Sequence, residues 1–276
     1  MLTFSHADLG TVVEILRDAA RAEIMPRFRG DVPKRTREKT SRQDLVTDAD
    51  EAAEAAITAA LLRAFPGCAV VGEEATERDP ALLDALGEPD LAFVIDPIDG
   101  TKNFASSLPL FGVMAAVLRR GEIVAGVILD PAEDDWALAL RGEGAWLQRA
   151  DGRRHDLHVA PAPSLAEMAG LVSWTFFPGD ERSRVPARFP RVANASDYRC
   201  AAHQYRLLCG GFYDFALYSK LMPWDHAAGW LLHREAGGYS ACLDGSPYAA
   251  TRHEGGLLCA PDRDSWALLS DALLRP

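Results

Sequence analysis

Two aspartates, Asp96 and Asp99, stand three residues apart at the end of the apolar run 91–95. A strand that ends here can direct both carboxylates to one point, and Gly100 permits a tight turn directly afterwards. If a helix begins after that turn, the free amides of Gly100 and Thr101 face a bound phosphate oxygen. The pattern therefore indicates a site where divalent cations and a phosphate group meet. The structural alternative is an Asp-rich turn whose side chains only bind local amides.

Three further acids stand next to apolar segments. Glu73 follows the apolar run 69–71, Asp225 stands at the start of an apolar helix, and Asp50 lies near the start of another helix. Each has a purely structural alternative. Asp225 can serve only as an N-cap, Asp50 only as part of a capping box, and Glu73 only as a solvated surface charge.

A group of acids without histidine or cysteine favours Mg²⁺ over zinc, because Mg²⁺ prefers carboxylate, carbonyl and water oxygens. The net charge of −11, from 40 acidic and 29 basic residues, fits carboxylates that hold cations and thereby accept an anionic ester. Without cations these acids repel one another, so we expect a less stable metal-free site. No dense basic run is present, which favours a small phosphorylated metabolite over nucleic acid as the primary partner.

The elements expected in the first half position most of these acids. Apolar residues at helical spacing predict an opening helix over 6–28, which the polar stretch 30–43 ends. A second helix is predicted from Thr47 to Phe65, with Asp50 completing a capping box. Strands are predicted at 69–71, 91–95, 111–118, 123–129 and 136–140. Because the later strands are joined by short turns, we expect an antiparallel sheet.

The second half repeats this mixture. The polar and then Ala/Pro-rich stretch 148–163 indicates a boundary between an N-terminal metal-binding half, 1–150, and a C-terminal half, 151–276, that contributes Asp225. Within the second half we expect helices at 201–208, 225–235 and 265–274, and a strand at 212–217. Helices and strands in separate runs predict an α+β fold.

The remaining composition points to an ordinary globular protein. A chain of 276 residues with 48% hydrophobic residues is long enough for a substantial core. The five cysteines are odd in number and form no CxxC pair, so we expect reduced, buried thiols. No signal-peptide pattern and no apolar stretch of membrane-spanning length is present, which predicts a cytoplasmic location without a membrane partner.

Read together, these motifs resemble those of the inositol monophosphatase-like family of magnesium-dependent, lithium-sensitive phosphatases. The similar residues are Gly72-Glu73-Glu74, the DPIDGT sequence with Asn103-Phe104, and Trp224 to Gly229. Upstream, Lys39 and the segment 44–50 extend the resemblance, which spans about residues 35–240. It implies a layered αβαβα sandwich of the inositol monophosphatase/fructose bisphosphatase type, two to three Mg²⁺ ions per site, and a homodimer.

The resemblance also implies a role for each acid. The first Mg²⁺ is expected on Glu73, Asp96 and the carbonyl of Ile98. The second is expected on Asp96, Asp99 and Asp225. Two bound ions can activate a water molecule and stabilise the leaving alkoxide, so no nucleophilic side chain is needed.

The attacking water and the phosphate are expected on the other side of the same turn. Glu73, helped by Asp50, is expected to place a third, weaker ion and the water, which Thr101 orients. The amides of Gly100 and Thr101 are expected to receive the phosphate.

The substrate wall departs from the best-known inositol phosphatases. Tyr218 falls where those enzymes carry a glutamate that binds inositol hydroxyls, and a phenol cannot accept two hydroxyl protons as a carboxylate can. Tyr218 therefore either binds substrate or is a rim aromatic. Arg199, before Cys200 and Ala201, replaces a glycine at the wall, and it either contacts a second anionic group or lies on the surface. Lys102 is a weak indication of nucleotide bisphosphate or histidinol phosphate substrates.

Three nearby side chains are expected to be structural. His203 and Tyr205 are expected to pack within a helix, although both could line the pocket. His226 is expected to be structural, since oxygen ligands already complete the metal site.

The predicted function is Mg²⁺-dependent hydrolysis of a small phosphate monoester. Within the family, the alternatives are histidinol phosphate, a sugar bisphosphate or a 3'(2'),5'-bisphosphate nucleotide. A haloacid dehalogenase-type phosphatase is disfavoured, because its aspartates stand two apart and near the N-terminus. A regulatory binding protein on the same fold is the non-enzymatic alternative, and the presence of Glu73, Asp96, Asp99 and Asp225 favours catalysis over it.

Overall fold

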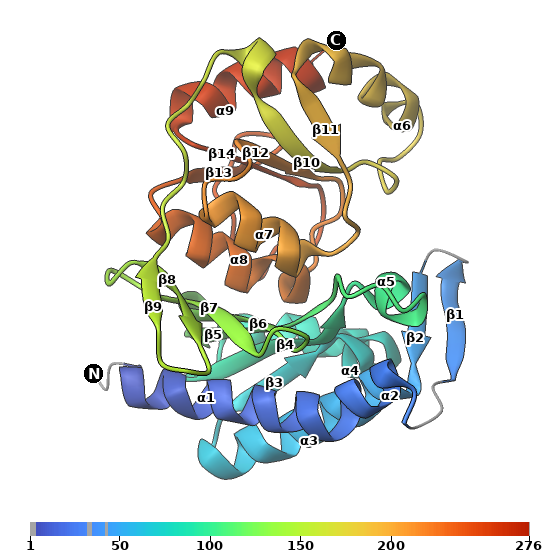
Figure 1. The fold of residues 1–276 in the computed structure, drawn as a ribbon, viewed down its shortest axis with the longest axis vertical. Helices are drawn as coiled ribbons and strands as arrows, with labels where there is room; N and C mark the ends of the chain where they lie inside the picture. Colours follow the sequence, from blue (N-terminus) through green and yellow to red (C-terminus); the bar gives the residue numbers. More distant parts are fainter. Residues whose placement is uncertain (1–3, 32–34, 42–43, 276) are drawn as a thin grey trace.

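The computed structural model describes residues 4–31, 35–41 and 44–275. Figure 1 shows five layers, with two sheets separated by a helical layer and covered by helices on their outer faces. This is the αβαβα sandwich that the family resemblance implied. No helix in the described ranges is long and apolar enough to cross a membrane.

The first outer layer contains the two long helices predicted from the sequence. Helix α1, His6–Ala19, continues through a π-helical turn, Ala20–Ile24, into α2, Met25–Arg29. Helix α3, Asp48–Ala64, begins after Thr47, and the predicted capping box with Asp50 is present. Both long helices pack their apolar faces against the larger sheet.

A short hairpin interrupts the polar stretch between these helices. Strand β1, Thr36–Ser41, pairs antiparallel with β2, Asp44–Thr47. The sequence predicted only a break here, because the polar side chains of this segment give no strand signal. Part of the predicted break, at 32–34 and 42–43, lies outside the described residues.

The larger sheet has the order β3-β4-β5-β6-β7-β8-β9. The strands are Ala69–Gly72, Ala92–Asp99, Gly112–Arg119, Glu122–Asp130, Asp135–Leu140, Ala145–Arg149 and Arg154–Asp156. The five predicted strands are present, and the pairs from β4 onward are antiparallel as expected. Strands β3 and β4 are parallel instead, because α4, Glu73–Arg78, and a 3-10 segment, Pro80–Gly87, form a crossover between them.

The smaller sheet has the order β11-β10-β12-β14-β13. These strands are Asn194–Ser196, Ala169–Ser173, Phe215–Tyr218, Leu257–Ala260 and Tyr239–Cys242. Only β12 was predicted from the sequence, and it begins three residues later than expected. Phe212 to Asp214 form the preceding turn, where the Asp214 carboxylate accepts a hydrogen bond from the Ala169 amide.

The remaining helices complete the middle and second outer layers. Helix α5, Thr101–Ala105, follows β4 directly. Helices α7, Ala201–Cys209, and α8, Pro223–Glu235, lie between the sheets, and α9, Arg263–Leu269, covers the smaller sheet and continues as a π-helical turn, Ser270–Leu274. Short segments on the outside are α6, Glu181–Arg184, and 3-10 turns at Leu165–Glu167 and Pro186–Arg191.

The middle layer is packed closely enough to fix the position of α8. A Cβ added at Gly126 on β6 would lie 2.8 Å from the carbonyl oxygen of Ala228 on α8. The backbones of β6 and α8 therefore touch, which places Asp225 at the start of α8 in a fixed position relative to the larger sheet. All five cysteines of the chain are buried and free, as predicted.

Candidate metal-binding and active site

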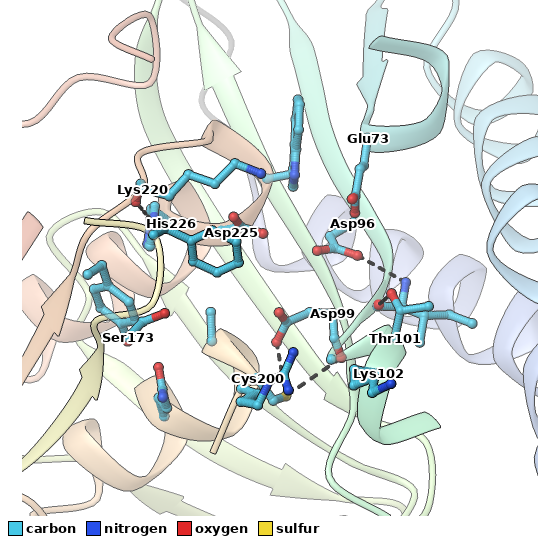
Figure 2. Close-up of a pocket in the computed structure, with 18 of the residues that line it drawn as sticks. Glu73, Asp96, Asp99, Thr101, Lys102, Ser173, Cys200, Lys220, Asp225 and His226 are labelled. Atoms are coloured by element: carbon cyan, nitrogen blue, oxygen red, sulfur yellow. Dashed lines mark hydrogen bonds between the residues drawn. The ribbon is translucent and has the colours of Figure 1, made fainter. Parts of the chain in front are cut away.

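A pocket lies where the carboxyl end of β4 meets the start of α7 and α8. Its lining comes from both halves of the chain, as the labelled side chains of Figure 2 show. The predicted site residues that line it are Glu73, Asp96, Ile98, Asp99, Gly100, Thr101, Arg199, Ala201, Tyr218 and Asp225. Asp50 lies directly behind this lining.

A β-bulge explains how Asp96 and Asp99 reach the same pocket. In a regular strand, residues three apart point to opposite faces of the sheet. Here Asp96 pairs with Met114 and Asp99 pairs with Gly112, so β4 contains one more residue than β5 between these pairs. The extra residue turns both carboxylates to the face covered by α7 and α8. Gly100 then adopts φ +85°, a conformation that permits the sharp turn into α5.

Three carboxylates converge at this point. Asp96, Asp99 and Asp225 each offer an oxygen within 4.8 Å of the other two. Oδ1 of Asp96 accepts a hydrogen bond from the Ile98 amide at 3.0 Å, whereas Oδ2 is buried and has no hydrogen-bond partner among the described residues. Such a buried carboxylate oxygen needs a cation or a proton.

Asp225 is the acid that the second half contributes. It lies in the first turn of α8, whose N-cap is Met222, so Asp225 is not the capping residue. The N-cap alternative considered for this residue is therefore wrong. At this position the carboxylate is stabilised by the helix dipole while its side chain faces the pocket.

Glu73 reaches the pocket because a second acid fixes the helix on which it stands. The carboxylate of Glu54, buried on α3, accepts hydrogen bonds from the amides of Glu74 and Ala75 at 2.7 Å each. These bonds satisfy the first turn of α4. Lys39 contacts Glu73 Oε1 at 3.0 Å and Glu74 Oε1 at 2.6 Å. Glu73 is thus a partly buried, paired group, and the solvated-surface alternative is wrong.

Asp50 serves both as a capping residue and as a neighbour of the site. Its Oδ2 accepts hydrogen bonds from the amide and the hydroxyl of Thr47, at 2.9 and 2.5 Å. Its Oδ1 accepts one from the Thr101 hydroxyl at 3.2 Å, and that hydroxyl also lies 2.9 Å from the Ile98 carbonyl. The capping box therefore fixes a carboxylate oxygen next to Thr101.

The second half holds Asp99 in place. The Cys200 thiol and the Ala202 amide both donate to Asp99 Oδ2, at 3.0 and 2.6 Å. Two donors on one oxygen leave Oδ1 of Asp99 available to the pocket. Nearby, the Asn103 side-chain amide donates to the carbonyls of Leu110 and Tyr198, which ties the two halves together.

The electrostatics of the metal-free site reflect crowded, buried acids. Burial raises the pKa of Asp96 well above its usual value, and the charges of Glu73, Asp99 and Asp225 raise it further. Burial and then the charge of Asp225 raise the pKa of Asp99 to about 7. Burial also raises the pKa of Asp50 to about 7. Bound cations would remove this destabilisation, and the all-oxygen donor set with one orphaned buried oxygen fits Mg²⁺.

The predicted substrate wall is only partly as expected. Arg199, with φ +53°, lines the pocket together with Ala201 and Lys102. Tyr218 also borders it, but the residue is only 3% exposed and its ring stacks on Tyr205. The interpretation of Tyr218 as a rim aromatic is therefore wrong, since its ring belongs to the middle layer. Its hydroxyl has no hydrogen-bond partner within the described chain.

The three side chains expected to be structural are placed as predicted. Tyr205 is fully buried, and His203 faces a different cavity. His226 borders the pocket, yet both of its ring nitrogens are engaged, one with the Lys220 carbonyl and one with the Tyr205 hydroxyl.

Sequence reasoning missed several lining residues that belong to no motif. Ser173 ends β10, Thr175 and Phe176 follow it, and Lys220 follows β12. Their only sequence signal is their place after apolar strand segments, which does not distinguish a pocket from any other loop.

Known proteins resemble this chain in sequence and in fold. The sequence model described as the inositol monophosphatase family matches residues 8–273. The chain is 31% identical over 236 residues to the Nus factor SuhB of Haemophilus influenzae, covering 80% of this chain and 79% of that protein. Among solved structures, the extragenic suppressor protein suhB of Bartonella henselae superposes with a TM-score of 0.82 at 25% identity, covering 98% and 99% of the two chains. An IMPase of Thermotoga maritima superposes with a TM-score of 0.77 at 26% sequence identity, covering 97% of this chain and 95% of that chain.

Proposed function

Because the chain belongs to the inositol monophosphatase family, we propose that it hydrolyses a small phosphate monoester in a Mg²⁺-dependent reaction. One observation carries this proposal. The oxygens of Asp96, Asp99 and Asp225 converge within 4.8 Å, with a buried, unpartnered oxygen on Asp96, directly beside the turn at Gly100.

Mg²⁺ would be held by Asp96, Asp99 and Asp225, with Glu73 and the carbonyl of Ile98 on the side of β3. When bound, Mg²⁺ supplies neutralisation of the phosphoryl charge and a lower pKa for a water molecule. All of these ligands are hard oxygen donors, as the ion requires.

The chain's own groups then bind the ester and place the water. Amides at the start of α5 have no carbonyl partner in a preceding turn, so those of Gly100 and Thr101 bind the phosphoryl oxygens. The Thr101 hydroxyl, held between Asp50 Oδ1 and the Ile98 carbonyl, orients the attacking water. Asp50 Oδ1, 3.2 Å from that hydroxyl, is a carboxylate oxygen that can take up a proton passed through it.

Side-chain nucleophiles are not required at this site. The only thiol bordering the pocket is that of Cys200, and it donates to Asp99 within a buried contact. Burial and the Asp99 charge raise the pKa of this thiol well above its usual value, so it remains protonated and weakly nucleophilic. These features support direct attack by water rather than a covalent intermediate.

The identity of the alcohol is a separate question. Tyr218 stands where a carboxylate would bind inositol hydroxyls, and its hydroxyl is buried in the middle layer. This difference weakens the case for inositol and leaves histidinol phosphate, sugar bisphosphates and nucleotide bisphosphates as candidates.

A second candidate function is a regulatory binding role. The relative from Haemophilus influenzae, 31% identical, carries the name Nus factor. A protein with that role can retain the fold without turnover, so activity has to be measured directly.

The test is phosphate release from a panel of these esters, with Mg²⁺ and with chelator. We expect Mg²⁺-dependent release, and a loss in Asp96→Asn of more than about 100-fold, because even outer-shell changes at metal sites cost 10- to 100-fold. The exposed Asp18→Asn on α1 is the matched control. No release from folded, Mg²⁺-loaded protein on any ester would overturn the proposal and favour the regulatory role.

A further inference from the structure

Lys220 is a cation at the pocket whose backbone is fixed by its neighbours. The Ser219 hydroxyl, one residue earlier, donates to the Ser173 carbonyl at 2.5 Å. His226 Nε2 donates to the Lys220 carbonyl at 2.9 Å, since a carbonyl oxygen can only accept, and its Nδ1 lies 3.1 Å from the Tyr205 hydroxyl. Lys220 is thereby attached to α8 beside Asp225.

Lys220 is exposed to solvent, and its side chain borders the pocket. Figure 2 shows it reaching from the end of β12 past Asp225 toward the carboxylate cluster. Its charge is close enough to Glu73 to lower the pKa of that carboxyl, after the larger effects of burial, Lys39 and Asp225. An ammonium group in this position faces whatever is bound over the acids.

An exposed aromatic ring lies beside this ammonium. Phe176 is 48% exposed and lines the same pocket, and its ring centroid is 5.8 Å from Lys220 Nζ. A large apolar side chain left half-exposed at a pocket wall offers an apolar contact to a ligand. The ring and the cation thus form one surface, contributed by the loops after β10 and β12.

The charges around the pocket indicate what this surface could bind besides the phosphoryl group. Two Mg²⁺ ions would neutralise Glu73, Asp96, Asp99 and Asp225, and would also face the phosphoryl oxygens. The remaining acid of the lining, Asp197, accepts hydrogen bonds from the Arg199 amide at 2.8 Å and from Gln204. Lys220, beside Phe176 in the lining, would then be a positive charge that these acids no longer offset.

We propose that Lys220 and Phe176 form a rim site for the alcohol part of the ester, selecting phosphate monoesters whose alcohol carries a second anionic group beside a flat apolar moiety. This inference rests on the proposed phosphatase function. It assigns specificity to two residues outside every motif of the sequence. The second anion is a carboxylate or a further phosphate, and both are recognised by an ammonium group at short range.

The experiment compares matched aromatic esters on the Mg²⁺-loaded enzyme. Phenyl phosphate carries no second anion, 4-carboxyphenyl phosphate carries a carboxylate, and 1,4-phenylene bisphosphate carries a phosphate. Propyl phosphate lacks the ring. For each ester, kcat/KM is measured in the wild type, in Lys220→Gln, in Phe176→Ala, and in Arg63→Gln, an exposed change of the same charge at the far end of α3.

We expect the wild type to prefer at least one anionic aromatic ester over phenyl phosphate. Lys220→Gln should reduce that preference about tenfold, mainly through KM, which corresponds to the loss of one ion pair. Phe176→Ala should reduce the preference for phenyl over propyl phosphate. Arg63→Gln should leave both ratios unchanged.

The outcomes separate this inference from the function on which it rests. Release from phenyl phosphate with no preference for an anionic ester, or a preference unaltered in Lys220→Gln, overturns the rim site and leaves the phosphatase function standing. An equal loss on all esters in Lys220→Gln also overturns it, because Lys220 would then act on the phosphoryl group. Absence of release from every ester overturns both.

Discussion

The pocket has two walls that are built in different ways. The carboxylate wall, Glu73, Asp96 and Asp99, stands at the ends of buried strands, and its backbone is held by sheet pairing and by the buried Glu54. The loop wall, Phe176, Arg199 and Lys220, stands on connections of the smaller sheet.

This difference in construction matches two requirements of one site, which are fixed positions for the ligands and a variable surface for the alcohol part of the substrate. Metal ligands have to stay within about half an ångström of their productive positions, and buried hydrogen bonds give the carboxylate wall the rigidity that its proposed role as a metal site requires. The alcohol part of a substrate varies between enzymes of one fold, and loops can change without disturbing the sheet. On the two proposals made above, the chemistry and the selection of the substrate lie on different walls of the pocket.

The largest effect on this arrangement is expected where the two walls touch. Cys200→Ala removes the thiol that donates to Asp99 Oδ2, which leaves the Ala202 amide to hold that carboxylate. We expect Mg²⁺ affinity to fall roughly 10- to 100-fold, as for other lost outer-shell partners. Calorimetric Mg²⁺ titration measures this directly, with phosphate release as a second readout.

Cys200→Ser is the matched control, because its hydroxyl restores a donor of similar position. Recovery of Mg²⁺ affinity in the serine variant would show that the hydrogen bond matters. Equal weakening in both variants would instead show that Cys200 acts only through packing, and the two walls would then be independent.

A smaller effect concerns the stability of the carboxylate wall alone. The pKa values of Asp50 and Asp99 are raised to about 7 in the folded, metal-free protein. Between about pH 4 and 7, these two carboxyl groups therefore bind more protons in the folded state than in the unfolded state. Their contribution to the free energy of unfolding is fully present below about pH 4 and is lost as the pH rises through about 7. We expect the Tm of chelator-treated protein to fall over this range, by roughly 2–4 °C per kcal/mol.

Thermal unfolding at several pH values, with chelator and with Mg²⁺, measures this effect. Mg²⁺ should reduce the fall or reverse it, because cations then replace the protons. A Tm that is independent of pH in the chelated protein would contradict the crowded arrangement of acids described above.

The smallest effect is expected at Tyr218. Its hydroxyl is buried and unpartnered among the described residues, so Tyr218→Phe should leave the free energy of unfolding unchanged or raise it by about 1 kcal/mol. Chemical denaturation measures this. If the hydroxyl binds substrate, as the sequence suggested, KM will rise in the variant; an unchanged KM would remove Tyr218 from the substrate wall.

Sequence reasoning succeeded where a local pattern determines a local geometry. Asp96 and Asp99 were identifiable because a strand, a glycine turn and a short helix follow one another within residues 92–105. The capping box of Thr47 and Asp50 was predictable for the same reason, because its two residues are close together in the sequence. The strands of the larger sheet were also predictable, since short turns link apolar runs.

The loop wall could not be predicted, because its contacts join residues far apart in the chain. The contact of Cys200 with Asp99 spans 101 residues. Lys220 and Phe176 are brought together by the parallel pairing of β10 with β12, strands that the sequence did not both reveal. Glu54 was missed because its partners are backbone amides 20 and 21 residues away.

The division of the proposed metal ligands between the two halves also affects the order in which the site forms during synthesis. During synthesis the chain emerges from its N-terminus at about 5–20 residues per second, and the first half can pair its strands before the second half exists. Asp225 follows Glu73 by more than half of the chain, so the complete ligand set forms only on the order of ten seconds after Glu73 has been made. Until then the nascent first half carries its crowded acids without Asp225. A bound cation can therefore stabilise the complete site only near the end of translation.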